Sequence, residues 1–176
     1  MPLLTTLGIN LVQGGAAYPG HIHPELAGVH SVVGRTSLRD VLRLIYHAEG
    51  VICPVTFAMH VAGAFSKPCV AIAGGREPWW WEWYSNSADR HFGAQCSSVR
   101  VPHRFLHTQG MFDWCRNGGC WKTQLQARLP RSSRDCLMTE ADGKGILSPA
   151  CLRAITPEIV AKAVLSYYRD GTLAPL

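Results

Sequence analysis

The sequence predicts an α/β protein with a parallel sheet, followed by an irregular cysteine-rich segment and a C-terminal helix. Up to Gly75, short runs of β-branched residues alternate with helical patterns, which is typical of βαβ units around a parallel sheet. The next roughly sixty residues show little periodicity, which is unusual inside a folded domain. A capped, amphipathic helical pattern then occupies residues 156–170.

One domain is expected over residues 1–176, because this length suits one core and is short for two. We divide it into a sheet-based core at 1–78, a Trp- and Cys-rich segment at 79–155 and the final helix. With 47% apolar and 16% charged residues, the composition excludes intrinsic disorder. The net charge of +5 is spread thinly along the chain, so nucleic acid is not an expected partner.

The N-terminal segment predicts neither a membrane span nor a signal peptide. It is apolar, but it lacks a basic flank and reaches Gly14 and Gly15 too soon to cross a bilayer. Seven cysteines in a chain without a secretory signal favour reduced thiols. We therefore expect a cytoplasmic protein.

The first half of the chain contains the elements of the sheet. Strands are predicted at 9–13, 29–33, 50–55 and 68–75. A helix after Ser37 has Asp40 three residues beyond its cap, as in a capping box, and a second, small-residue helix is predicted at 56–65. The apolar positions of the first helix fall at helical spacing: Leu38, Val41, Leu42 and Ile45.

The last helix has clear start signals. Thr156 can act as its cap, Pro157 suits the first helical position and Glu158 lies in the first turn. One apolar face is expected to pack against the core, consisting of Ile159, Val160, Ala163, Val164 and Tyr167.

The best candidate site is the segment CPVTFAMHVAGAF, which joins a predicted strand to a predicted helix. In open α/β folds, ligands bind at the carboxyl ends of the strands. Free N–H groups at the helix start, the Thr56 hydroxyl and His60 could hold a diphosphate. Alternatively, Thr56 is only a helix cap and His60 a hydrogen-bonded core residue.

The run GRTSLRDVLRLIYHAEGVICPVTFAMHVAGAFSKPCVAIAGG resembles glycosyltransferase family 9, the heptosyltransferases of lipopolysaccharide assembly. The resemblance implies two Rossmann-like domains that face each other across a cleft, the GT-B fold, with this chain as the C-terminal, donor-binding half. It implies inverting transfer from a nucleotide sugar to a glycan or protein acceptor. By position, the residues lining the donor site would be Thr56, Ala58, Met59 and His60.

The chain departs from the family pattern in two ways. Many members have Asp-Thr-Gly before the histidine, whereas this chain has Val55, Thr56 and Phe57. The resemblance also does not extend to the family's acceptor domain, nor to the first strand and helix of its donor domain. We therefore expect a chain that is incomplete as an enzyme, completed by a separate acceptor domain or by self-association. The rival is a non-catalytic module that binds a nucleotide sugar or a partner chain.

A tryptophan run follows the last predicted strand, at Trp79, Trp80, Trp81 and Trp83. These rings could stack on a nucleobase or sugar, or they could simply cover the sheet. In the family, a G-x-x-x-P loop borders the nucleotide at this place. The resemblance therefore implies that Arg76, Glu77 and Pro78 lie near the donor.

Four cysteines predict a structural metal site for iron or zinc: Cys115, Cys120, Cys136 and Cys151. The sequence GGCWK is similar to a motif of autotransporter heptosyltransferases, which carry iron on four cysteines. Free thiols, including a nucleophilic Cys115 or Cys120, are the alternative. Either His103 or His107 could replace one ligand, although cysteine is the preferred choice. Cys53 and Cys69 are expected to be small buried apolar residues.

Overall fold

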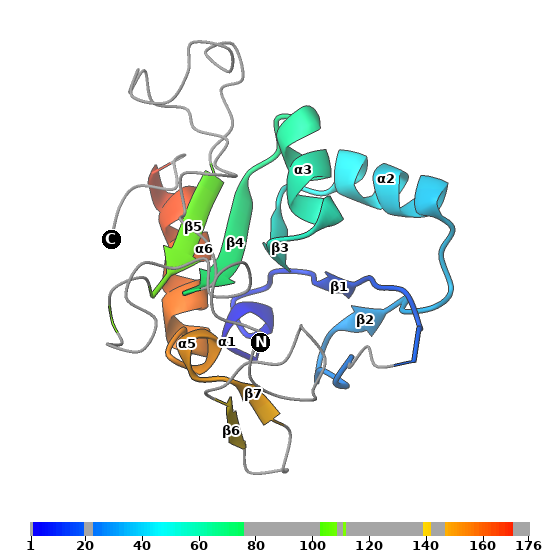
Figure 1. Ribbon diagram of the computed structural model, residues 1–176. Helices are drawn as coiled ribbons and strands as arrows, with labels where there is room; N and C mark the ends of the chain where they lie inside the picture. Colours follow the sequence, from blue (N-terminus) through cyan, green and yellow to red (C-terminus); the bar gives the residue numbers. More distant parts are fainter. Residues whose placement is uncertain are drawn as a thin grey trace, which may run out of the picture.

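The computed structural model describes residues 2–19, 23–75, 103–108, 111, 139–141 and 147–170. None of the described helices combines the length and the apolar character that crossing a membrane requires. The described elements, in chain order (Figure 1), are α1 (Pro2–Thr5), β1 (Val12–Gln13), β2 (His30–Ser31), α2 (Leu38–His47), β3 (Val51–Pro54), α3 (Phe57–Ala64), β4 (Cys69–Gly74), β5 (His103–His107), β6 (Thr139–Ala141), β7 (Leu147–Pro149), α5 (Ala150–Arg153) and α6 (Pro157–Asp170).

The central sheet has the strand order β3-β4-β5, and both pairs are parallel. Cys69 of β4 lies opposite Val51 on one side and His103 on the other. A second parallel pair, β1 with β2, is not hydrogen-bonded to this sheet. Parallel pairing with a helical connection between β3 and β4 confirms the predicted α/β class.

Helices cover both faces of the central sheet (Figure 1). On the face covered by α2 and α3, the buried cluster includes Ile45, Met59, Cys69, Ala71 and Phe105. The opposite cluster joins α6 to the sheet and consists of Val70, Leu106, Val160 and Ala163. Successive residues of β4 therefore point into different cores, as expected for a parallel strand that is buried on both faces.

The predicted helix starts are confirmed at α2 and α6. The Ser37 side chain accepts from the Asp40 amide, and the Asp40 carboxylate accepts from the Ser37 amide, which completes the capping box. Hydrogen bonding to the Thr156 side chain lowers the pKa of Glu158 in the first turn of α6. On α6, Val160 and Ala163 are buried, whereas Ile159 remains 36% exposed.

The segment expected to be irregular contains regular elements. β5, β6, β7 and α5 all fall within residues 79–155. Cys151, which belongs to the segment predicted to be irregular, lies in α5. β5 escaped prediction because its sequence HRFLH has only two apolar residues between polar ones, and Phe105 and Leu106 are buried on opposite faces only once β5 pairs with β4.

The N-terminal segment also differs from the prediction. Residues 2–5 form the short helix α1, and Leu4 is only 1% exposed where α1 packs near α6. The two predicted strands that follow are shorter than expected, with two residues each in β1 and β2. A packed turn of helix therefore precedes β1, at residues for which no element was predicted.

Candidate functional site

The carboxyl ends of the three central strands lie at one edge of the sheet, and α5 covers the ends of β4 and β5. Gly74 ends β4 with φ +63°, and a Cβ at this position would lie 2.8 Å from the Leu152 side chain of α5. Thr108, just after β5, donates its amide to the Gly74 carbonyl at 3.1 Å and its hydroxyl to the Cys151 carbonyl at 3.0 Å. Among the described residues, this leaves the end of β3 as the accessible part of the edge.

The first turn of α3 follows directly on β3. Thr56 is the N-cap residue, with extended backbone at φ −150° and ψ 179°, but its side chain does not cap the helix. Its hydroxyl instead donates to the Pro54 carbonyl at 3.3 Å. The Met59 amide donates to the Thr56 carbonyl at 3.0 Å. No described residue supplies an acceptor for the amides of Phe57 and Ala58, so this turn can receive an anion.

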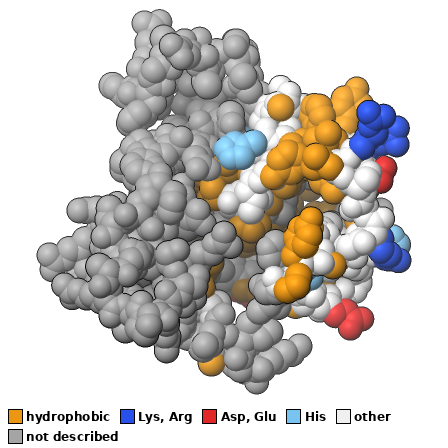
Figure 2. Space-filling view, turned by 45° about the vertical axis from the view of Figure 1, so that its right-hand side comes forward, with side chains coloured by type: hydrophobic (Ala, Val, Ile, Leu, Met, Phe, Trp, Pro, Cys, Tyr) orange, Lys and Arg blue, Asp and Glu red, His pale blue; other side chains and the backbone are white. Residues whose placement is uncertain are grey.

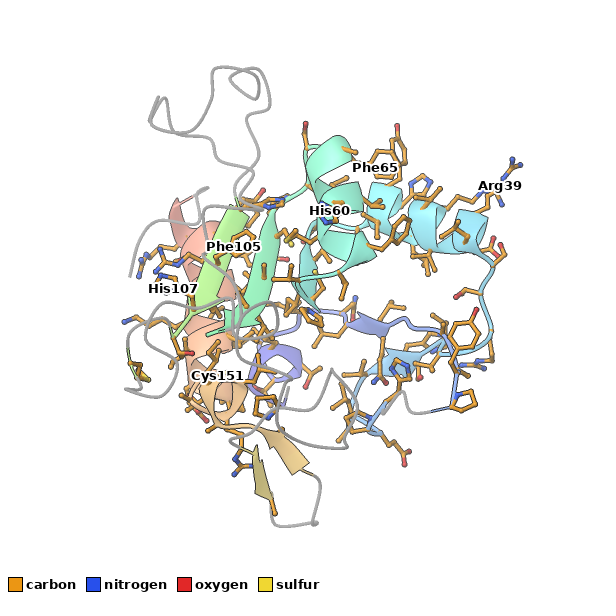
Figure 3. All side chains as sticks on the ribbon, in the orientation of Figure 1. Arg39, His60, Phe65, Phe105, His107 and Cys151 are labelled. Atoms are coloured by element: carbon orange, nitrogen blue, oxygen red, sulfur yellow. The ribbon has the colours of Figure 1, made fainter. Side chains whose placement is uncertain are left out.

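The predicted site residues on α3 separate into two groups. Thr56 and His60 are exposed and Ala58 is half-buried, whereas the Met59 side chain is completely buried in the core. Met59 can therefore meet a ligand only through its backbone. His60 lies one turn after Thr56, on the helix that packs on the sheet (Figure 3).

His60 also acts electrostatically on β5. Burial, and then the nearby charge of His60, lower the pKa of His103 to about 4. His103 is only 6% exposed, at the amino end of β5, so its imidazole is neutral at neutral pH. Burial and the charge of Arg104 also lower the pKa of His107, at the other end of this strand.

Phe57 is a candidate binding residue that the sequence did not indicate. It is the first residue of α3 and is 49% exposed beside the open amides, where its ring could stack on a sugar or base. Figure 2 shows hydrophobic side chains gathered on this side of the molecule, over α2 and α3. Because α3 is apolar almost throughout, periodicity could not show which residue faces outward.

Several predicted residues lie outside the described part of the chain. They are Arg76, Glu77, Pro78, Trp79, Trp80, Trp81, Trp83, Cys115, Cys120 and Cys136. Of the four expected metal ligands only Cys151 is described, and it is 7% exposed against the end of β4. Within the described ranges, no three His, Cys, Asp or Glu residues are grouped as metal ligands would be. Cys53 and Cys69 are buried, as predicted.

A shallow cavity of about 410 Å³ lies between α1 and α6, away from the predicted donor residues. Its lining combines leucines with charged residues of α6: Leu3, Leu7, Glu158, Ala161, Lys162, Leu165, Ser166 and Arg169. None of the described residues expected to bind the donor contributes to it. The candidate site is therefore the open first turn of α3, and not this shallow cavity.

Comparison with known proteins identifies the family. The model of glycosyltransferase family 9 (heptosyltransferase) matches residues 14–101, half of the 176-residue chain. This range includes β2, α2, β3, α3 and β4, and with them the first turn of α3. Neither the curated proteins nor the solved structures gave a significant match. The chain belongs to glycosyltransferase family 9, the heptosyltransferase family.

Proposed function

We propose that this chain is the donor-binding half of a heptosyltransferase-type enzyme, which transfers a sugar from a nucleotide sugar to a glycan or protein acceptor in the cytoplasm. The observation that carries the proposal is the open first turn of α3 at the carboxyl end of β3. Family membership supports glycosyltransferase activity in general. The local geometry supports the binding of a diphosphate.

The first turn of α3 offers the groups that a diphosphate needs. Amides of Phe57 and Ala58 point out of the helix start, where the helix dipole adds partial positive charge. The exposed Thr56 hydroxyl can exchange its hydrogen bond with Pro54 for one to a phosphate oxygen. We assign Thr56, Ala58, the Met59 amide and His60 to the diphosphate, and Arg76 and Glu77 to the nucleotide.

Sugar recognition must differ from that of family members with an acidic residue before the threonine. Val55 occupies that position, and its half-buried side chain packs against the core. It supplies no carboxylate to the sugar hydroxyls. The ring of Phe57, two residues later and 49% exposed, can stack on a sugar instead.

Thermal unfolding with ADP-, GDP- and UDP-sugars at millimolar concentration tests donor binding. A ligand bound only by the folded chain raises the melting temperature by mass action. Thr56→Asp should abolish the rise, because aspartate is a good helix cap whose carboxylate takes the amides and repels the diphosphate. Ser37→Asp, the equivalent change at the start of α2, is the matched control and should leave the rise intact.

The absence of a melting shift with every nucleotide sugar would overturn donor binding. A shift that Thr56→Asp leaves unchanged would place the donor elsewhere.

The lack of a carboxylate at Val55 favours a second candidate, a module that binds the nucleotide sugar without transferring it. Incubation with the stabilising donor and a glycan acceptor, with and without an acceptor domain from the family, separates the two: the donor-binding half should release free nucleoside diphosphate only when the acceptor and the acceptor domain are present, and the non-catalytic module should never release it.

We also propose that a structural iron or zinc ion is held by the four cysteines assigned to it. Cys151 is buried in α5, with its sulfur 3.3 Å from where a Cβ of Gly74 would lie. A metal bound there would tie the cysteine-rich segment to the end of β4. Its role would be to stabilise the fold, because a buried thiol at this place is poorly accessible to a substrate.

A further inference from the structure

Cys53 and Cys69 form a pair of free thiols in the core beneath α3. The two sulfur atoms lie 3.8 Å apart, within hydrogen-bonding distance, on the adjacent strands β3 and β4. Cys53 is 7% exposed and Cys69 is fully buried. In the register Cys53 lies opposite Ala71, two residues along β4 from Cys69, so the two side chains meet diagonally across the strands.

We propose that Cys53 and Cys69 are an oxidation site, at which peroxide converts the two thiols into a disulfide that links β3 to β4. Cys53 is the thiol oxidised first, and Cys69 is the resolving thiol. The site lies outside the predicted metal ligands and does not depend on donor binding. Its position connects it to the candidate site, since Cys53 is three residues before Thr56.

The environments of the two thiols suit these different roles. Hydrogen bonding to Cys69, opposed by burial and assisted by the Thr56 hydroxyl, lowers the pKa of Cys53. The hydrogen bond to Cys53 and burial raise the pKa of Cys69. Sensitive cysteines combine thiolate character, some access and a neighbouring resolving thiol. Cys53 is the more accessible of the pair, and it is the one whose pKa is lowered.

The chemistry balances with hydrogen peroxide as the oxidant. The Cys53 sulfur attacks one peroxide oxygen, the O–O bond breaks, and a sulfenic acid forms with release of one water. The Cys69 sulfur then attacks the Cys53 sulfur and displaces the hydroxyl group as a second water. Two thiols are oxidised to one disulfide, and one peroxide is reduced to two waters.

Closing the bridge requires the strands to move. A disulfide bond is about 2.05 Å long, so the sulfur atoms must approach by about 1.8 Å. On parallel strands, positions offset by two residues have Cα atoms about 8 Å apart, beyond the usual range for a disulfide. Part of the approach must therefore come from the backbone, and β3 carries Pro54 and Thr56 with it. Oxidation is expected to loosen the first turn of α3.

The two cysteines can be followed in a single peptide. Trypsin does not cut between Lys67 and Pro68, so residues 44–76 form one tryptic peptide that contains Cys53 and Cys69 and no other cysteine. The intact chain is treated with hydrogen peroxide, denatured in iodoacetamide, digested and analysed by mass spectrometry. We expect this peptide to lose two hydrogen atoms and both alkylations, and to recover both alkylations after treatment with dithiothreitol.

The same experiment on Cys53→Ala and Cys69→Ala should give no bridged peptide. The wild-type peptide tests for the Cys53–Cys69 disulfide even if a variant does not fold. Full alkylation of both cysteines after oxidation, or bridges that join either one to a different cysteine, would overturn the proposal.

Hydrogen exchange tests the link to α3: amides of residues 55–62 should exchange faster after oxidation, while those of α2 remain unchanged. Unaltered exchange at 55–62 would overturn that link and leave the disulfide site itself standing.

Discussion

Burial of His103 at the amino end of β5 links the stability of the fold to pH. Burial, followed by the charge of His60, lowers the pKa of His103 from 6.5 to about 4. The unfolded chain therefore binds a proton between these values and the folded chain does not. Stability is complete above about pH 6.5 and is lost as the pH falls towards 4.

Urea unfolding at pH 7 and pH 5 measures this effect. The wild-type free energy of unfolding should fall between the two pH values by about 2 kcal/mol from His103 alone. His103→Gln removes the titrating group, so the difference between the two pH values should shrink by this amount. His47→Gln, at an exposed position on α2, is the control and should leave the difference unchanged.

The first turn of α3 shows how far prediction reaches at the level of single residues. Thr56 was predicted at the helix start, and it is the N-cap. Met59 was assigned to the donor site by resemblance, yet its side chain is in the core. α3 is apolar on nearly every side, so its rotation is set by packing against the sheet, which the sequence alone does not reveal. The same packing turns Phe57 outward, so the sequence alone did not reveal its position either.

At the level of elements, α2 depends on its capping box. Ser37 supplies the side chain that accepts from the Asp40 amide. Ser37→Ala removes this acceptor and should lower the free energy of unfolding by about 1 kcal/mol. Ser37→Gly should lower the free energy of unfolding by only a few tenths of a kcal/mol, because glycine is tolerated at a helix cap. Equal losses in the two variants, measured by urea unfolding, would contradict a role for the side chain.

A hydrogen bond connects the helix α6 to the segment that follows α2. The Tyr168 hydroxyl donates to Glu49 at 2.6 Å, and this bond raises the pKa of Tyr168 to about 12. Tyr168 is 50% exposed, so solvent screens the interaction. A double-mutant cycle with Tyr168→Phe and Glu49→Gln should give a coupling of about 0.5 kcal/mol. Strict additivity of the two changes would show that the bond does not contribute.

The elements were predictable where local signals are strong. α2 and α6 have caps and apolar faces, and both begin where the sequence predicted. β4 was found from its apolar run. β5 was not, because its short apolar centre is flanked by histidines and becomes a strand only beside β4. Tertiary pairing, and not local propensity, determines such a strand.

At the level of the whole molecule, the proposed metal site is expected to stabilise the fold, and metal analysis tests it. Freshly purified protein should contain about one iron or zinc ion per chain. Cys115→Ser and Cys120→Ser should each remove the metal and lower the melting temperature, because metal binding is coupled to folding. Cys53→Ser, at a thiol outside the proposed ligand set, should retain it. Metal-free protein with an unchanged melting temperature would count against the site.

The separation of the sheets has a consequence for how the molecule opens. The β1–β2 pair is held by a few backbone hydrogen bonds, among them those from the amides of His30 and Val32, and shares none with the central sheet. Such a pair forms a local unit whose opening free energy lies well below that of global unfolding. Amides of the β1–β2 pair should therefore exchange with solvent faster than those of β3, β4 and β5.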